Sequence, residues 1–222
     1  LSRNQYDAVV LDVNMPKMNG LQLLEELRKF RIPARIMMAS TDTMEGADTT
    51  IRALELGALD FVHKPDSAMD CRVVEFKTNF LRTLDIVANS AMPVFETESQ
   101  IREIEKTTTK MVDFAKKFHA KTPGTKVVAM ASSTGGPKAL QEVIPRLPAD
   151  LDAPVLLVQH MPKGFTASLA KRLNELSEIK VKEAQEGDEL EKGTVYVAMG
   201  GQHMNVRTSP AGRYTIHYSD EP

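Results

Sequence analysis

Two stretches of the chain alternate apolar runs with amphipathic segments. In the first stretch, the β-branched and apolar run over residues 6–13 predicts a strand buried on both faces of a parallel sheet. Leu23, Leu24, Leu27 and Phe30 then recur at spacings of three and four with charged residues between them, which is typical of an amphipathic helix. The chain therefore begins with the strand-then-helix order of an α/β protein.

The same alternation continues toward residue 88. Residues 34–40 and 60–64 predict two further strands, and the helix expected between them, over 47–58, has a C-terminal stop signal in Gly57. Apolar residues at helical spacing over about 71–88 predict a helix that covers one face of the sheet.

A second alternation follows a segment with polar ends. Its predicted elements are, in order, strand 126–131, helix 135–147, strand 154–159, helix 165–176 and short strands around 180–184, 194–199 and 213–218. The segment before it carries a helical stripe between polar runs and predicts a partly helical linker. We therefore expect an α/β protein of two doubly wound parallel-sheet domains, residues 1–88 and 125–222, joined by a linker over 89–124.

Composition excludes several classes of function. The 222 residues are 42% hydrophobic and 26% charged, with a formal net charge of -2 and basic residues scattered among acidic ones. Nucleic-acid binding requires a basic face, so we expect no nucleic-acid partner. No apolar run reaches the roughly 18 residues of a membrane span and no signal peptide is recognisable, which predicts a cytoplasmic protein without membrane insertion. The single cysteine, Cys71, excludes an internal disulfide.

Polar side chains stand at the ends of the three strands expected in the first domain. Asp12 ends the first strand, Ser40 with Thr41 beside it ends the second, and Lys64 ends the third. If the strands are neighbours, an acid, a hydroxyl and an ammonium group converge at one sheet edge, which suits an aspartyl phosphate. Each residue alone is as well explained by a turn, a loop start or a surface position.

The segments "LDVNMPKMNGL", "RALELGALDF" and "HKP" resemble the receiver domain of two-component response regulators over residues 1–88. The resemblance implies a flavodoxin-like fold, with Asp12 as phosphoacceptor, Asn14 offering its backbone carbonyl to Mg²⁺, Ser40 as switch hydroxyl and Lys64 contacting the phosphoryl group. Receivers also hold the metal with an acidic pair on an earlier strand. That pair is not in this sequence, so we expect incomplete coordination of Mg²⁺.

The stretch "ASSTGGPKAL", residues 131–140, places small residues between a predicted strand and a predicted helix. Such a turn can cradle a phosphate or present a serine nucleophile. A dinucleotide site would show GxGxxG and an acid at the end of the next strand, whereas that strand ends in His160. Ser133 and His160, at neighbouring strand ends, can come within hydrogen-bond reach.

The residues that follow Ser133 suit the same chemistry. Gly135 and Gly136 allow a tight turn, and the helix beginning near Pro137 points its N–H groups at negative charge developing on a substrate oxygen. Thr134 is a further candidate donor. Taken singly, a serine before a helix is usually an N-cap and a histidine at a strand end is usually structural.

Three segments, "ASSTGGPKAL", "QHMPKGFTASLAKRLN" and "EAQEGDELEKGTVYVAMGGQHMNV", resemble the catalytic domain of the chemotaxis response regulator protein-glutamate methylesterases over residues 126–222. That family carries a receiver domain in front, so both resemblances indicate one architecture, with a Rossmann-like esterase domain. They imply that Ser133 is the nucleophile and His160 its general base, and that Ser132 is the neighbour a test must exclude.

The family completes its triad with an aspartate beyond the position of Pro222, so we expect the 222 residues alone to be a poor enzyme. Asp188 lies in a charged loop and Asp220 near the last residue, and neither is assigned to catalysis. His203 matches a family segment, and its role is left open.

The resemblance implies hydrolysis of glutamate methyl esters, and deamidation of glutamines, on methyl-accepting chemoreceptors. It also implies phosphorylation of Asp12 by a histidine kinase with Mg²⁺, no cofactor for ester hydrolysis, and a receiver that blocks the esterase until phosphorylated. Two alternatives stay open, a non-enzymatic response regulator with a partner-binding output domain and a nucleotide-binding output domain.

Overall fold

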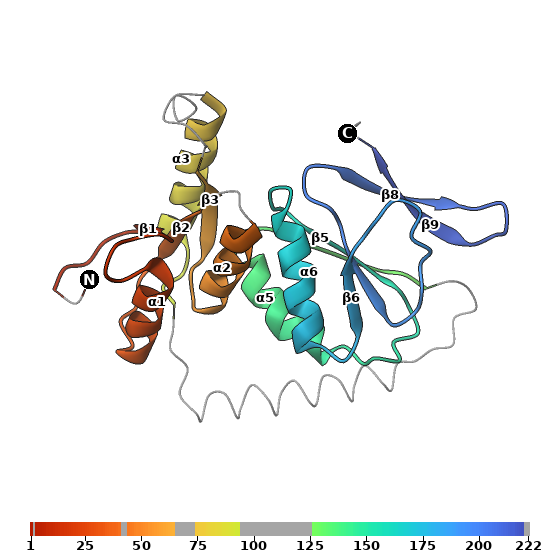
Figure 1. The fold of residues 1–222 in the computed structure, drawn as a ribbon, viewed down its shortest axis with the longest axis horizontal. Coiled ribbons are helices and arrows are strands. Elements are labelled where there is room, and N and C mark those ends of the chain that lie inside the picture. The colour runs from red at the N-terminus through yellow and green to blue at the C-terminus, as the bar shows by residue number, and fades with distance from the viewer. Residues whose placement is uncertain (2, 41–43, 65–73, 94–125, 220–222) are drawn as a thin grey trace.

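The computed structural model describes the chain except for residues 2, 41–43, 65–73, 94–125 and 220–222 (Figure 1). Most of the predicted linker, together with Thr41, Cys71 and Asp220, therefore lies outside the described residues. Among the described residues, helices and parallel strands alternate in two separate sheets, which confirms the α/β class. No helix in this part of the chain is long and apolar enough to cross a membrane.

The first sheet is parallel and brings the predicted strand ends to one edge. It contains β1 (Val9–Asp12), β2 (Ile36–Ser40) and β3 (Asp60–His63), in the order β1-β2-β3. In this register Asp12 lies opposite Ala39, and Ser40 lies opposite His63. The carboxyl ends of the three strands are thus adjacent, as the sequence predicts.

Helices lie on both faces of this sheet. They are α1 (Gly20–Lys29), α2 (Met44–Glu55) and α3 (Val74–Asn89). α1 begins at a capping box in which Asn19 and Gln22 exchange side-chain-to-backbone hydrogen bonds. Phe76, Phe80 and other apolar residues of α3 pack on Met37 and Val62, while α1 and α2 cover the opposite face.

The first strand differs from its prediction. β1 has four residues, and Val10 is 42% exposed rather than buried on both sides. β1 is an edge strand of the described sheet, and α3 packs mainly on β2 and β3. A run of valines and leucines predicts a strand, but it does not say which neighbours cover it.

The second sheet is also parallel, in the order β4-β5-β7-β6. Its strands are β4 (Val128–Ser132), β5 (Val155–Gln159), β6 (Lys180–Glu183) and β7 (Thr194–Val197). Helices α5 (Gly136–Val143), its short extension η2 (Ile144–Arg146) and α6 (Phe165–Leu176) bury Val155 and Leu157 on one face. α6 has the bounds that its apolar periodicity predicts.

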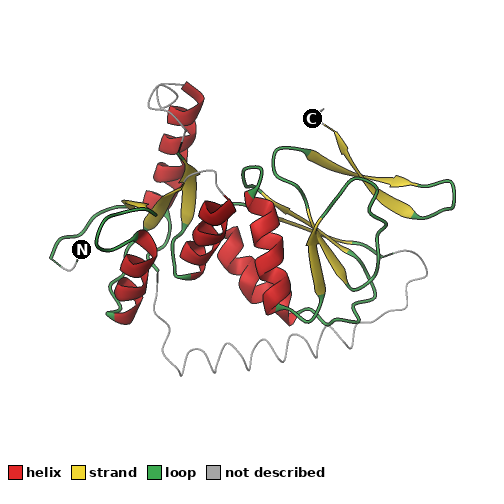
Figure 2. Ribbon diagram, viewed as in Figure 1, coloured by secondary structure: helices red, strands yellow, loops and turns green. Residues whose placement is uncertain are grey.

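A two-stranded antiparallel hairpin ends the described chain (Figure 2). It consists of β8 (His203–Thr208) and β9 (Tyr214–Ser219), and Ile216 packs on Tyr196 and Ala184 on the other face of the second sheet. β8 was not predicted as a strand, because its residues are mostly exposed and lack a period-two apolar pattern.

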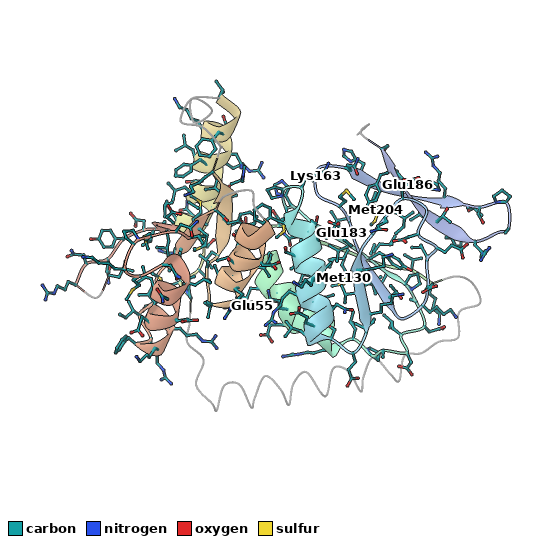
Figure 3. The ribbon with its side chains drawn as sticks, in the orientation of Figure 1. Glu55, Met130, Lys163, Glu183, Glu186 and Met204 are labelled. Atoms are coloured by element: carbon teal, nitrogen blue, oxygen red, sulfur yellow. The ribbon has the colours of Figure 1, made fainter. Side chains whose placement is uncertain are left out.

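The two halves meet where α2 packs against α5 and α6 (Figure 1). Phe61 of β3 stacks on Phe165 of α6 with ring centroids 4.6 Å apart. Glu55 lies at the end of α2 (Figure 3). Arg172 of α6 lies 2.5 Å from one of its carboxylate oxygens. Apolar residues of both halves form one buried cluster, so the halves share a packed interface. The domain bounds 1–88 and 125–222 stay predictions.

Candidate active site

Ser133 and His160 follow the ends of two paired strands. β4 and β5 are in register with Ser132 opposite Gln159, so the next residue on each strand leads into a loop at the same sheet edge. Ser133 Oγ lies 3.5 Å from His160 Nδ1, and both residues are exposed. This distance exceeds the roughly 2.6–3.2 Å of a working nucleophile and base, and such contacts often shorten only when substrate binds.

The neighbouring serine is placed differently. Ser132 Oγ donates a 2.7 Å hydrogen bond to Gln159 Oε1, and the residue is only partly exposed. Its hydroxyl is therefore engaged inside the fold, whereas the Ser133 hydroxyl faces His160 and the solvent. The geometry favours Ser133 over Ser132 as the nucleophile.

The turn after Ser133 has the conformation that its glycines suggest. Gly135 has a φ of +76°, in the left-handed region, and Pro137 lies in the first turn of α5. The Gly136 N–H donates to the Ser133 carbonyl at 2.7 Å, so this donor is used within the turn. Thr134, the residue directly after Ser133, is then the better candidate to contact a substrate oxygen, because the N–H groups of Gly135 and Gly136 both donate within the protein.

Receiver residues contact this turn. Thr134 Oγ1 donates a 2.5 Å hydrogen bond to Asp60 Oδ2, and the Gly135 N–H donates to the Leu59 carbonyl at 3.2 Å. Burial raises the pKa of the Asp60 carboxyl, and hydrogen bonds from Thr134 and from the Phe61 N–H, with the charge of His160, offset it only in part. Ser133 itself stays exposed, so the receiver engages the turn without covering the nucleophile.

Asp12 and Lys64 meet at the edge of the first sheet. Lys64 Nζ lies 2.9 Å and 3.0 Å from the two carboxylate oxygens of Asp12, and the Asn14 N–H donates to one of them at 3.1 Å. Burial raises the pKa of Asp12, but the hydrogen bonds from Lys64 and Asn14 and the charge of Lys64 outweigh it, so the pKa lies below its ordinary value. Two of the three predicted strand-end residues are thus in contact.

Ser40 is placed toward α2. It is fully buried; its hydroxyl donates to the Gly46 carbonyl at 3.3 Å and accepts from Thr50 Oγ1 at 2.7 Å. Its backbone carbonyl accepts from the Lys64 N–H at 2.6 Å. Ser40 therefore joins the sheet edge that holds Asp12 and Lys64 to α2, the helix that packs on the second half.

In the described part of the chain, no cluster of three or more His, Cys, Asp or Glu residues could hold a metal. Asp12 supplies one carboxylate, and Asn14 has the carbonyl that the receiver resemblance assigns. Oxygen donors of this kind suit Mg²⁺, which is often held by one or two carboxylates and several waters. The Mg²⁺ assignment stays a prediction.

Sequence reasoning missed two residues that the structure brings to the site, Asp60 and Gln159. Asp60 is the first residue of β3 and Gln159 is the last residue of β5, and a polar residue at the terminus of a buried strand is a recognisable signal. Asp188, left unassigned, pairs with Lys182 at 2.8 Å and accepts from the Gln185 N–H at 2.9 Å, a structural role. His203 lies exposed on β8.

Comparison with known proteins separates the same two halves. The CheB methylesterase family matches residues 128–222, and the response regulator receiver domain family matches residues 1–72. A protein-glutamate methylesterase/protein-glutamine glutaminase of Pyrococcus horikoshii is 44% identical over 97% of this chain and 56% of its own length. The protein-glutamate methylesterase/protein-glutamine glutaminase of Bacillus subtilis is 40% identical over 95% of this chain and 58% of its own length.

Among solved structures, the Thermotoga maritima CheB methylesterase catalytic domain aligns with 43% identity and a TM-score of 0.43, over 45% of this chain and 52% of that one. The chain spans a little over half the length of the curated relatives named above. Each half carries its own family's match, and the relatives match across both. The chain belongs to the family that joins a response regulator receiver domain to a CheB methylesterase domain.

Proposed function

We propose that the whole protein is a carboxylic-ester hydrolase that removes methyl groups from glutamate methyl esters and deamidates glutamines on chemoreceptors. The observation that carries this proposal is the 3.5 Å approach of Ser133 Oγ to His160 Nδ1 at the carboxyl edge of two parallel strands. The glycine turn and the N-terminus of α5 adjoin this pair and favour negative charge on a substrate oxygen.

The reaction follows from the two side chains. Ser133 Oγ attacks the ester carbonyl carbon while His160 accepts the serine proton, which gives a tetrahedral oxyanion. The oxyanion collapses, the bond to methoxide breaks, and the imidazolium returns its proton to form methanol. Water, deprotonated by His160, then attacks the acyl-enzyme and releases glutamate and free Ser133. With a glutamine side chain the leaving group is ammonia.

The receiver half takes a phosphoryl group on Asp12. Lys64, within 3.0 Å of both carboxylate oxygens, is placed to hold the phosphoryl oxygens that this group would bring. Asp12 and the Asn14 carbonyl would hold Mg²⁺, which when bound neutralises charge on the phosphoryl oxygens. The phosphodonor is a histidine kinase of chemotaxis, and the compartment is the cytoplasm.

Phosphorylation controls the esterase through the contacts that the receiver makes with the nucleophile turn. Leu59 and Asp60 occupy a backbone donor and a hydroxyl donor on the two residues after Ser133. α2 carries Thr50 and Gly46, the partners of Ser40, and packs on α6. A change at the Asp12 edge is therefore transmitted to the interface through a short chain of contacts, which shifts the population of the closed arrangement.

The test is methanol release from methyl-labelled receptor membranes by the whole protein, with and without a small phosphodonor such as acetyl phosphate. We expect turnover that phosphodonor raises, that Ser133→Ala abolishes and that Ser132→Ala lowers without abolishing it. Turnover that is insensitive to both serines overturns the assignment of the nucleophile. Absence of turnover in every sample favours a non-enzymatic regulator, and saturable ATP or NAD binding at the turn favours a nucleotide-binding output domain.

A further inference from the structure

We propose that Gln159 is a positioning residue that ties together the main chains of Ser133 and His160 and so sets their reacting distance. This inference rests on the catalytic roles proposed above for those two residues. Gln159 itself is buried, and the proposal gives it no contact with the substrate.

The contacts of the Gln159 amide carry the inference. The residue ends β5 and is 5% exposed. Its Nε2 donates to the Ser133 carbonyl at 3.1 Å and to the His160 carbonyl at 3.0 Å, while its Oε1 accepts from Ser132 Oγ at 2.7 Å. One side chain therefore bonds to the backbone of both members of the dyad and to the residue before the nucleophile.

These partners also fix the orientation of the amide. Two carbonyl oxygens can be bonded only by a donor, and the amide nitrogen has two hydrogens to give. The hydroxyl of Ser132 then faces the amide oxygen. A flipped amide would place its oxygen against two carbonyls in a buried site, which is strongly unfavourable. The amide nitrogen thus faces two acceptors and the amide oxygen faces one donor.

The start of α5 is built around this amide. A Cβ on Gly136 would lie 2.1 Å from Gln159 Oε1 and 2.8 Å from Ser132 Cβ, so only glycine lets the helix approach so closely. The Gly136 N–H also donates to the Ser133 carbonyl at 2.7 Å, the same oxygen that Gln159 holds. The helix start, the nucleophile turn and Gln159 form one connected unit.

The consequence is geometric. The backbone ladder between β4 and β5 extends to the hydrogen bond from His160 N to the Ser132 carbonyl, at 2.9 Å. The hydrogen bond from the Gln159 amide to the Ser133 carbonyl connects the two main chains one residue further on. At that point the side chains of Ser133 and His160 are both exposed. A displacement of about 1 Å between reacting groups can cost about 10²-fold in rate.

The experiment uses Gln159→Glu in the whole protein. Glutamate has the same shape, but a carboxyl group has at most one hydrogen to donate, so the side chain at position 159 loses its hydrogen bond to at least one of the two carbonyls. We expect kcat for methanol release to fall by about 10²-fold while KM stays near the wild-type value. The rate at which a small fluorophosphonate modifies Ser133 is expected to fall in parallel.

Gln185→Glu is the matched control, because it makes the same chemical change at an exposed residue of the same half. It is expected to keep the wild-type kcat, KM and modification rate. Ser132→Ala keeps the Gln159 amide and removes the hydroxyl that donates to its oxygen. We expect kcat to fall less than in Gln159→Glu, again at unchanged KM.

A wild-type kcat in Gln159→Glu, or a raised KM at unchanged kcat, overturns the proposal. If circular dichroism shows that Gln159→Glu does not fold, Ser132→Ala decides in its place: a lower kcat at unchanged KM upholds the proposal and a wild-type kcat overturns it. The modification rate of Ser133 tests the positioning role even where receptor membranes give no turnover. Failure of the proposed function, seen as activity that survives Ser133→Ala, is thus distinguishable from failure of this inference.

Discussion

Thr134 of the esterase half donates a 2.5 Å hydrogen bond to Asp60 of the receiver half, although the two residues are 74 positions apart in the chain. Thr134 directly follows the proposed nucleophile, and Asp60 begins the strand that ends beside Lys64. The two halves are therefore joined directly beside the proposed nucleophile. Because the Asp60 carboxyl is buried in this contact, the contact depends on its protonation.

Asp60→Asn should strengthen the closed arrangement. The raised pKa means that the closed arrangement binds the carboxyl proton more tightly than an arrangement in which Asp60 is exposed. The contact is then most stable below the ordinary carboxyl pKa of about 3.9 and weakens as pH rises through the raised pKa. Asparagine imitates the protonated form, so we expect lower basal methanol release than wild type at neutral pH.

Asp60→Ala removes the partner of Thr134 and should raise basal release, and Asp150→Asn, at an exposed acid, is the control. The ratio of the wild-type basal rate to the Asp60→Asn basal rate should increase with pH. An Asp60→Asn protein that turns over faster than wild type would contradict this account.

Glu55→Gln should loosen the packing of α2 on α6. Arg172 lies 2.5 Å from Glu55 across the interface, and the two side chains are 36% and 19% exposed. Partly exposed ion pairs contribute about 0.2–1 kcal/mol, so we expect basal release to rise by no more than about fivefold, less at high salt. Glu189→Gln breaks the 2.7 Å pair with Arg213 in the hairpin and should leave basal release unchanged. Equal effects of the two substitutions would contradict a role for the interface.

The sequence predicted most elements because their periodicity is strong. α6 lies where Leu169, Leu173 and their neighbours recur at helical spacing, and Gly57, with a φ of +115°, follows α2. The covering of β1 and the pairing of β8 depend on tertiary neighbours, which a local pattern does not contain.

The candidate site shows the same limit. Parallel strand ends brought Asp12 to Lys64 and Ser133 to His160, as topology alone implies. Sequence reasoning did not find Asp60, because its partner lies in the other half of the chain and the docking of the two halves has no local signature.

Asp12→Asn should abolish the response to phosphodonor. The amide cannot form an acyl phosphate, and it loses the charge that Lys64 Nζ meets at 2.9 Å. We expect methanol release by Asp12→Asn to be the same with and without acetyl phosphate. Asp7→Asn, an exposed acid before β1, should keep the wild-type response. Stimulation that persists in Asp12→Asn would place the phosphoacceptor elsewhere.

Gly136→Ala should lower both stability and kcat. The new Cβ would lie 2.1 Å from Gln159 Oε1, so either α5 moves away from the turn or the amide leaves the Ser133 and His160 carbonyls. Overpacking of this kind costs about 1–3 kcal/mol, which outweighs the higher helix propensity of alanine. Thermal unfolding and methanol release measured on one preparation separate the two effects.

Gly212→Ala, at the tip of the hairpin, is the control. Gly212 has a φ of +74° and no atom lies within 4 Å of the new Cβ, so the substitution strains the backbone without touching the nucleophile turn. It should lower the unfolding temperature slightly and leave kcat unchanged, whereas a Gly136→Ala protein with wild-type kcat would show that the approach of α5 to Gln159 does not position the nucleophile.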